Sequence, residues 1–232
     1  MMETGPFVRG AFGSKAWNTV LLGVVPFDPD IESLASRLRV TPDNPRRKEL
    51  DAMVRDAAAI AVPKAFYGWA HVEHQGDGQV RVEGETFVSR MLRSALGDAE
   101  VVLPFVATAG IELQSWAASA SSPLHAYWSD VIMDEALRCA LTALERHVAA
   151  RVGGRKTRCI KPGIPADWPV TEQRKLFALL GNMKKAVGVE LTDACLMIPL
   201  KTVSGLRFQT DSDVESCTWC PQKNCRHRKN PP

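Results

Sequence analysis

The chain has 232 residues, of which 45% are hydrophobic, and its formal net charge is only +3. A chain of this length buries a substantial core, as one large domain or two small ones. The charges are nearly balanced, and the basic residues are scattered except around 151–161 and 226–229. This distribution argues against a dedicated nucleic-acid binder, which carries a basic stripe along one face.

The N-terminal stretch has no targeting signature. Arg9 and Lys15 interrupt its apolar pattern, so no charged start is followed by an unbroken apolar run. Elsewhere, no stretch reaches the roughly 18 uninterrupted apolar residues that a membrane-spanning helix needs. We therefore expect a cytoplasmic protein without a membrane partner, in which thiols stay reduced.

The first half of the chain alternates between helix and strand patterns. Apolar residues at spacings of three and four predict a helix over 46–61, which Pro63 ends. Residues 65–82 predict a hairpin, because aromatic and β-branched residues flank the turn Gly76-Asp77-Gly78. Helical spacing returns over 86–96, and the continuous apolar run 101–108 predicts a strand buried on both faces.

The second half begins with the longest predicted helix, 129–152, which Gly153 and Gly154 end. Residues 155–169 lack periodicity, 171–180 predict a short helix, and 187–191, 195–200 and 203–208 predict strands. Together these elements predict one α+β domain over 1–210 and an irregular tail over 211–232.

The segment Pro162-Gly163-Ile164-Pro165 cannot be helix or regular strand. Each proline fixes φ and lacks a donor, whereas the glycine can adopt a positive φ. Such a loop leaves backbone groups outside secondary structure, where they meet water or a ligand. Physical chemistry alone leaves a simple tight turn and a ligand-binding loop both open.

A succession of short motifs follows this loop. In chain order they are Pro162-Gly163, Asp167-Trp168-Pro169, Glu172-Gln173, Leu176-Phe177-Ala178-Leu179-Leu180, Gly188-Val189-Glu190-Leu191-Thr192, Met197-Ile198-Pro199 and Val203-Ser204-Gly205. Their order and spacing resemble the reactivation domain of cobalamin-dependent methionine synthase, in particular its free-standing relatives. The resemblance continues upstream through Ala107-Thr108-Ala109-Gly110 and the long predicted helix.

This resemblance implies a helmet-shaped α+β fold with a twisted antiparallel sheet and flanking helices. It also implies a protein that binds S-adenosylmethionine in a shallow groove and docks over the cobalamin of a partner protein or domain. There it permits reductive remethylation of the inactive cob(II)alamin, with an electron from a flavodoxin or ferredoxin. The protein then needs only to position a methyl donor and a partner, since the cofactor carries the chemistry.

The resemblance places the S-adenosylmethionine site at Arg158, Lys161, Pro162, Gly163, Ile164 and Glu145. The family has an arginine where this chain has Cys159, so Arg158 or Lys161 would bind the ligand's carboxylate; only arginine offers a bidentate fork. Ile164 replaces an aromatic residue that could stack. The acid that the family's long helix presents to the ligand's amino group has no direct counterpart here, and Glu145 is the acidic residue near that position.

Three cysteines in the tail form a second candidate site. Cys217, Cys220 and Cys225 have the close spacing that brings several thiolates to one metal. A zinc ion needs a fourth ligand, which His227, Cys159 or Cys195 could supply, whereas an iron–sulfur cluster with an open iron needs only three. A reduced tail without metal is the third possibility.

Two functions therefore compete. The first is an accessory subunit of methionine synthase, contributing to its methyltransferase activity by positioning S-adenosylmethionine. The second is a non-catalytic binding module of a corrinoid methyltransferase system, with a metal- or iron–sulfur-binding cysteine tail.

Overall fold

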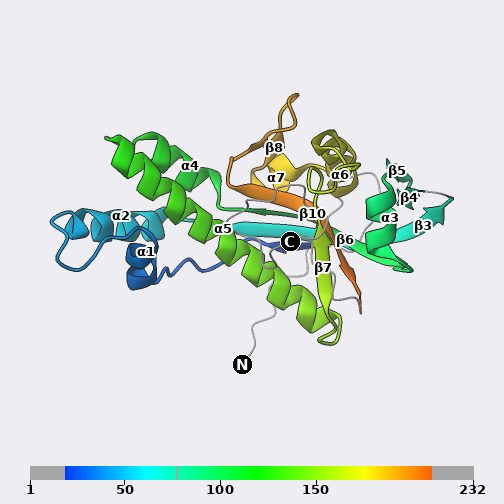
Figure 1. Ribbon diagram of the computed structural model, residues 1–232, viewed down its shortest axis with the longest axis horizontal. Coiled ribbons are helices and arrows are strands. Elements are labelled where there is room, and N and C mark those ends of the chain that lie inside the picture. The colour runs from blue at the N-terminus through cyan, green and yellow to red at the C-terminus, as the bar shows by residue number, and fades with distance from the viewer. Residues whose placement is uncertain (1–18, 77, 211–232) are drawn as a thin grey trace.

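The computed structural model of the protein describes residues 19–76 and 78–210. Within these residues, eight strands form one antiparallel sheet, and helices cover both of its faces (Figure 1). The predicted α+β class is confirmed. The predicted domain boundary at residue 210 stays a prediction.

The central strand of the sheet is β6, as its continuous apolar run predicts. One edge of β6 pairs first with β3 and then with β2, and its other edge pairs with β10, which in turn pairs with β7. The strands of the sheet are β1 (Thr19–Leu22), β2 (Lys64–Gly68), β3 (Ala70–Gln75), β4 (Gln79–Val82), β5 (Glu85–Val88), β6 (Val101–Thr108), β7 (Thr157–Ile160) and β10 (Thr202–Gln209). The short strands β8 (Glu190–Leu191) and β9 (Met197–Ile198) form a separate pair.

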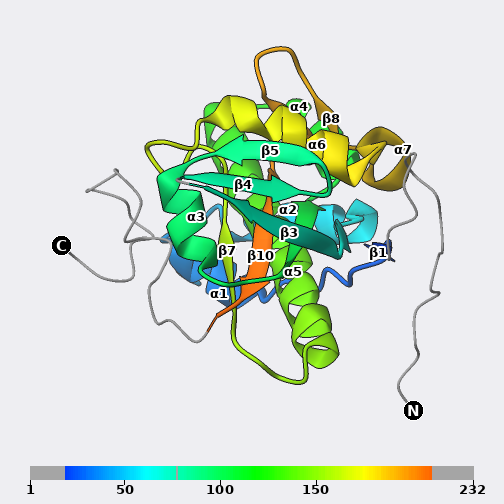
Figure 2. The same ribbon diagram turned by 90° about the vertical axis from the view of Figure 1, so that its right-hand side faces the viewer.

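The helices divide between the two faces of the sheet. They are α1 (Ile31–Arg37), α2 (Arg47–Ile60), α3 (Arg90–Leu96), α4 (Ile111–Ala118), α5 (Pro123–Arg151), α6 (Gln173–Leu180) and α7 (Met183–Val187), with a 3-10 turn at Val170–Glu172. The long helix α5 crosses one face, whereas α6 lies beside β5 on the other (Figure 2).

Alternate residues of β6 and β10 feed two different cores. Leu103, Phe105 and Val203 pack against α5. Their neighbours Val106 and Leu206 pack on the opposite face, with α6 and α7. A third core joins α1, α2, α4 and the first half of α5. The side of the sheet on which a residue of these strands lies is therefore known from its position in the alternation.

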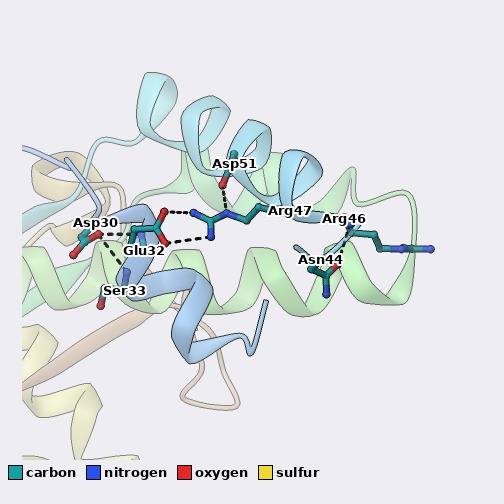
Figure 3. A network of polar contacts seen from close by, with 7 residues as sticks. All are labelled: Asp30, Glu32, Ser33, Asn44, Arg46, Arg47 and Asp51. Carbon is teal, nitrogen blue, oxygen red and sulfur yellow. Dashed lines mark hydrogen bonds and ion pairs between the residues drawn. The ribbon is translucent and has the colours of Figure 1, made fainter. Parts of the chain in front are cut away.

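Polar contacts hold α1 against α2 (Figure 3). Asp30 caps α1 by accepting hydrogen bonds from the backbone N–H groups of Glu32 and Ser33 at 3.0 and 3.2 Å. Arg47, at the start of α2, binds Glu32 of α1 and also donates to Asp51 one turn later at 2.7 Å. These contacts fix the angle between the two helices at a distance from the sheet.

The predicted helix over 86–96 is wrong in its first part. Residues Glu85–Val88 form β5, because they pair with β4 and bury Phe87. The helix α3 starts only at Arg90, after Ser89, whose hydroxyl accepts a hydrogen bond from the Leu92 N–H at 2.9 Å.

Other boundaries also differ from the prediction. The long helix begins six residues early, at Pro123, because Ser122 caps it and proline suits a first helical turn. The segment expected to be irregular contains β7. Of the predicted strands 187–191 and 195–200, only the short β8 and β9 form, and Val187 instead ends α7.

Candidate functional site

The Pro162 loop follows β7 directly and closes on itself. The Gly163 N–H donates to the carbonyl of Trp168 at 2.7 Å, and the Ile164 N–H donates to the carbonyl of Lys161 at 3.1 Å. Gly163 has a φ of +85°, which L side chains rarely adopt. Glycine is therefore needed here for the backbone, and its exposed surface stays free of a side chain.

The Asp167-Trp168 motif anchors this loop to the rest of the fold. Trp168 is fully buried and meets Phe87 edge to face, with ring centroids 5.9 Å apart. Asp167 accepts hydrogen bonds from the Ser89 hydroxyl at 2.7 Å and from the Met91 N–H at 3.2 Å. Burial raises the pKa of Asp167, but these hydrogen bonds outweigh it and hold the pKa below its ordinary value. The motif thus ties the loop to α3 and β5.

The two candidate ligand-binding cations at β7, Arg158 and Lys161, lie on opposite faces of the sheet. Cys159 packs in the core beneath α5, whereas Ile160 packs in the core on the other face. By strand alternation, Lys161 lies on the α5 face and Arg158 on the opposite face. The two cations that the sequence offers in place of the family's arginine are therefore not equivalent. Only Lys161 lies on the same face as Cys159.

Gly205 makes room for Lys161. In the register of β10 and β7, Leu206 lies opposite Ile160, so Gly205 comes next to Lys161. A Cβ atom on Gly205 would lie 3.2 Å from Cγ of Lys161 and only 2.6 Å from the carbonyl oxygen of Ile160. The bare backbone of Gly205 therefore permits the close approach of β7 and the path of the lysine side chain.

Glu145 lies on α5 and binds a residue that the sequence did not single out. Its carboxylate accepts a hydrogen bond from Nη2 of Arg207 at 2.7 Å. Arg207 belongs to β10, directly opposite Cys159. Its Nη1 also donates to the Thr157 hydroxyl at 2.9 Å.

The structure therefore brings Glu145, Cys159 and Lys161 to one face of β7 and β10, together with Arg207. It places Arg158 on the other face, away from them. Sequence reasoning missed Arg207, although a single arginine inside the apolar run Val203-Ser204-Gly205-Leu206-Arg207-Phe208 is a signal that could have found it.

Part of the chain that forms this face matches a known protein family. The family model of the vitamin B12-dependent methionine synthase activation domain matches residues 148–216, a stretch that holds β7, the Pro162 loop and β10. This part of the chain is similar to that activation domain. No curated protein sequence matches the chain.

A solved structure agrees with this relationship. The crystal structure of the MetH reactivation domain bound to AdoHcy matches with a TM-score of 0.56 at 17% sequence identity, over 84% of this chain and 80% of that one. At this identity the match establishes a shared fold. The activation-domain fold thus extends well beyond residues 148–216.

The predicted metal ligands Cys217, Cys220 and Cys225 lie outside the described residues. Within residues 19–76 and 78–210, no group of three or more His, Cys, Asp or Glu side chains is placed to hold a metal ion. Of the proposed fourth ligands, Cys159 is half-buried and Cys195 is buried. Zinc and iron–sulfur binding by the tail stay predictions.

A cleft of about 700 Å³ lies at the other end of β7 and β10 from the Pro162 loop, and Trp69, Leu103, Val152 and Gln209 are among its lining residues. Near it, the buried Tyr67 hydroxyl lies 2.7 Å from Nδ1 of His147.

In the part of the chain that the structure describes, no helix is both long and apolar enough to cross a bilayer.

Proposed function

We propose that the protein supports cobalamin-dependent methionine synthesis by binding S-adenosylmethionine and presenting it to the cobalamin of a partner protein. The observation that carries the proposal is the activation-domain match over residues 148–216, which includes the complete Pro162 loop. The shared fold with a reactivation domain bound to AdoHcy supports it.

The residues of this face suit the amino-acid end of such a ligand. Lys161 offers a cation and Glu145 a carboxylate on the same side of β7 and β10, and Gly163 leaves the adjoining loop surface without a side chain. A carboxylate and an ammonium group can pair with these opposite charges. The proposed site therefore comprises Lys161, Pro162, Gly163, Ile164 and Glu145.

The partner's cobalamin supplies the nucleophile for the methyl group. One electron, from a flavodoxin or ferredoxin, reduces the lapsed cofactor, and S-adenosylhomocysteine leaves after methyl transfer. This chain's residues hold and orient the methyl donor, and such positioning accelerates the transfer. No acid or base from the chain is required.

Calorimetric titration of the full chain with S-adenosylmethionine tests the ligand. We expect saturable binding that Gly163→Val abolishes, because valine resists the φ of +85°. Gly154→Val is the matched control, since Gly154 also has a positive φ, +75°, but lies before β7. Absence of heat at millimolar ligand would refute S-adenosylmethionine binding and favour the alternative of a non-catalytic binding module.

A reactivation assay tests the partner. Addition of the protein to a cobalamin-dependent methionine synthase module trapped as cob(II)alamin, with a flavodoxin reductant and S-adenosylmethionine, should produce the visible spectrum of methylcobalamin. The Gly163→Val variant should leave the cob(II)alamin spectrum unchanged. Equal rates with and without the native protein would contradict the proposed role.

A further inference from the structure

A hydrogen-bonded series of three side chains lies at the start of α5. The Ser121 hydroxyl is 2.9 Å from Nδ1 of His125, and Nε2 of His125 is 3.2 Å from the carboxylate of Glu49. Glu49 belongs to α2, 76 residues before His125 in the chain, so the packing of α2 beside α5 completes the series. The series lies at the end of α5 that is away from β7 (Figure 1), and it is therefore separate from the proposed S-adenosylmethionine site.

The order of these groups suits nucleophilic catalysis. A hydroxyl, an imidazole and a carboxylate in one series form a nucleophile, its general base and the group that orients the base. The Glu49 carboxylate can only accept, so the neutral imidazole carries its proton on Nε2 and donates a hydrogen bond to Glu49. Nδ1 of His125 is then the acceptor for the Ser121 hydroxyl, as the role of general base requires.

The His125 ring is also held from the side. It stacks on the buried indole of Trp128, with ring centroids 5.7 Å apart and an angle of 26° between the ring planes. The N–H of His125 donates to the Ser122 hydroxyl at 3.2 Å, which fixes the first turn of the helix. The side chain of His125 is 24% exposed, and that of Glu49 is 49% exposed. The base is therefore fixed in orientation but still reachable from solvent.

The helix itself favours the charge that develops in acyl transfer. Helix α5 has 29 residues and begins at Pro123, two residues after Ser121. An α-helix leaves its first N–H groups without an intrahelical acceptor, and its N-terminus carries a partial positive charge. Ser121 is exposed, and its chain neighbours Ala120 and Ser122 have small side chains. A carbonyl group can therefore reach the hydroxyl beside a positive helix end, which stabilises the oxyanion formed on attack.

We propose that Ser121 is a nucleophile that takes the acyl group of a small carboxylic ester, with His125 as its base and Glu49 as the orienting group. The site faces solvent, so a longer acyl chain would bury little apolar surface there and gain little affinity. Acetyl esters are therefore the substrate class. This activity is independent of S-adenosylmethionine and of the cobalamin partner.

The reaction balances without a cofactor. Oγ of Ser121 forms a bond to the carbonyl carbon of the ester while Nδ1 of His125 takes the hydroxyl proton. The bond between this carbon and the leaving oxygen then breaks, and the alcohol leaves with that proton. Water next gives a proton to Nδ1 as its oxygen attacks the acetyl-serine, which releases acetic acid and returns the proton to Oγ of Ser121.

The test uses p-nitrophenyl acetate and a fluorophosphonate probe on the full chain. We expect a burst of p-nitrophenolate from the ester. We also expect the probe to phosphonylate Ser121 with loss of fluoride, as located by mass spectrometry of peptides. Ser121→Ala should abolish both reactions. His125→Gln should slow both by roughly 10²–10⁴-fold, the contribution of a general base, and Glu49→Gln should slow both by less.

The matched control is Ser119→Ala. Ser119 is exposed like Ser121, but its hydroxyl donates to the carbonyl of Trp116 at 2.7 Å instead of to an imidazole. Its substitution should change neither rate. Circular dichroism checks that each variant is folded. Because Ser121 and Glu49 are exposed, their variants decide the question even if the His125 variant does not fold.

The outcomes separate this activity from the proposed function. The activity is overturned if the native chain gives neither burst nor label, or if Ser121→Ala reacts as fast as the native chain. Acetyl groups on lysines with Ser121 unmodified would also overturn it. None of these results bears on the calorimetric titration with S-adenosylmethionine, so either proposal can fail while the other stands.

Discussion

Gly205→Ala is the substitution that most directly tests the contact between β7 and β10. The new Cβ atom would lie 2.6 Å from the carbonyl oxygen of Ile160, and contacts below 3.0 Å essentially never occur for real Cβ atoms. The obstacle is backbone, so β7 itself must move away from β10. On its other sides the methyl group would meet Lys161 and Phe105 at 3.2 Å.

The expected magnitude follows from these distances. Overpacking of this kind costs roughly 1–3 kcal/mol. A weakened backbone hydrogen bond between the strands adds about 1 kcal/mol. The reduced entropy of the unfolded chain offsets less than about 1 kcal/mol. We therefore expect the free energy of unfolding to fall by roughly 1–4 kcal/mol.

Urea denaturation followed by tryptophan fluorescence measures this change. Gly23→Ala is the control, because among residues 19–76 and 78–210 its Cβ atom would meet nothing closer than Leu21 Cγ at 3.6 Å, and it should leave the midpoint nearly unchanged. A Gly205→Ala midpoint equal to that of the native chain would refute the close packing of β7 on β10. The variant should also bind S-adenosylmethionine more weakly, because Lys161 must shift with β7.

Three further predictions concern the anchor of the loop and the opposite end of the sheet. Asp167→Ala should lower the free energy of unfolding by roughly 0.5–2 kcal/mol, because it removes the hydrogen-bond acceptor at the start of α3. Folding lowers the pKa of Asp167, so the native chain should lose this stabilisation only as the pH falls below the ordinary pKa of 3.8. The variant should show no such loss. Trp168→Ala should cost about 3–5 kcal/mol in urea denaturation, because the indole is fully buried. Burial raises the pKa of Tyr67 to about 12, so in a Tyr127→Phe variant, where Tyr67 is the one remaining tyrosine, tyrosinate absorbance should not appear near pH 10 while the chain is folded.

Each of these predictions has a result that would contradict it. Equal acid sensitivity of the native chain and the Asp167 variant would mean that the carboxylate does not cap α3. A Trp168 variant as stable as the native chain would place the indole outside the core. Tyrosinate absorbance rising near pH 10, with the chain still folded by circular dichroism, would show that Tyr67 is accessible to water. The contribution of the buried, neutral Tyr67 to the stability of the folded chain is fully present below pH 10 and is lost as the pH rises toward 12.

The sequence predicted those elements whose signal is local. The apolar run of β6 and the turn after β3 carry their own pattern, and both were found at their places. Strand β5 was missed because its pairing with β4 overrides a helical spacing of the apolar residues. Strand β7 was missed because it is short and pairs, among the described strands, with β10 alone.

In the candidate site, too, the features with a local sequence signal were predicted and those that depend on distant contacts were missed. The Pro162 loop was predicted, since proline and glycine mark it directly. The separation of Arg158 from Lys161 depends on which face of β7 each one takes, and that depends on a register with a strand almost fifty residues later. The pairing of Arg207 with Glu145 spans 62 residues, so no local pattern could reveal it.

The position of β10 late in the chain also affects how the protein folds during its synthesis on the ribosome. Its partner β6 emerges early, and the hydroxyl of Thr202 on β10 reaches back 94 residues to Thr108 at the end of β6. Until β10 has been synthesised, the apolar β6 presents an open edge, which is the kind of surface that templates aggregation and that slows folding through non-local pairing. Nascent chains arrested before residue 202 should therefore depend on chaperones, and Lys161 and Glu145 can acquire their common surface only as the last described strand leaves the exit tunnel.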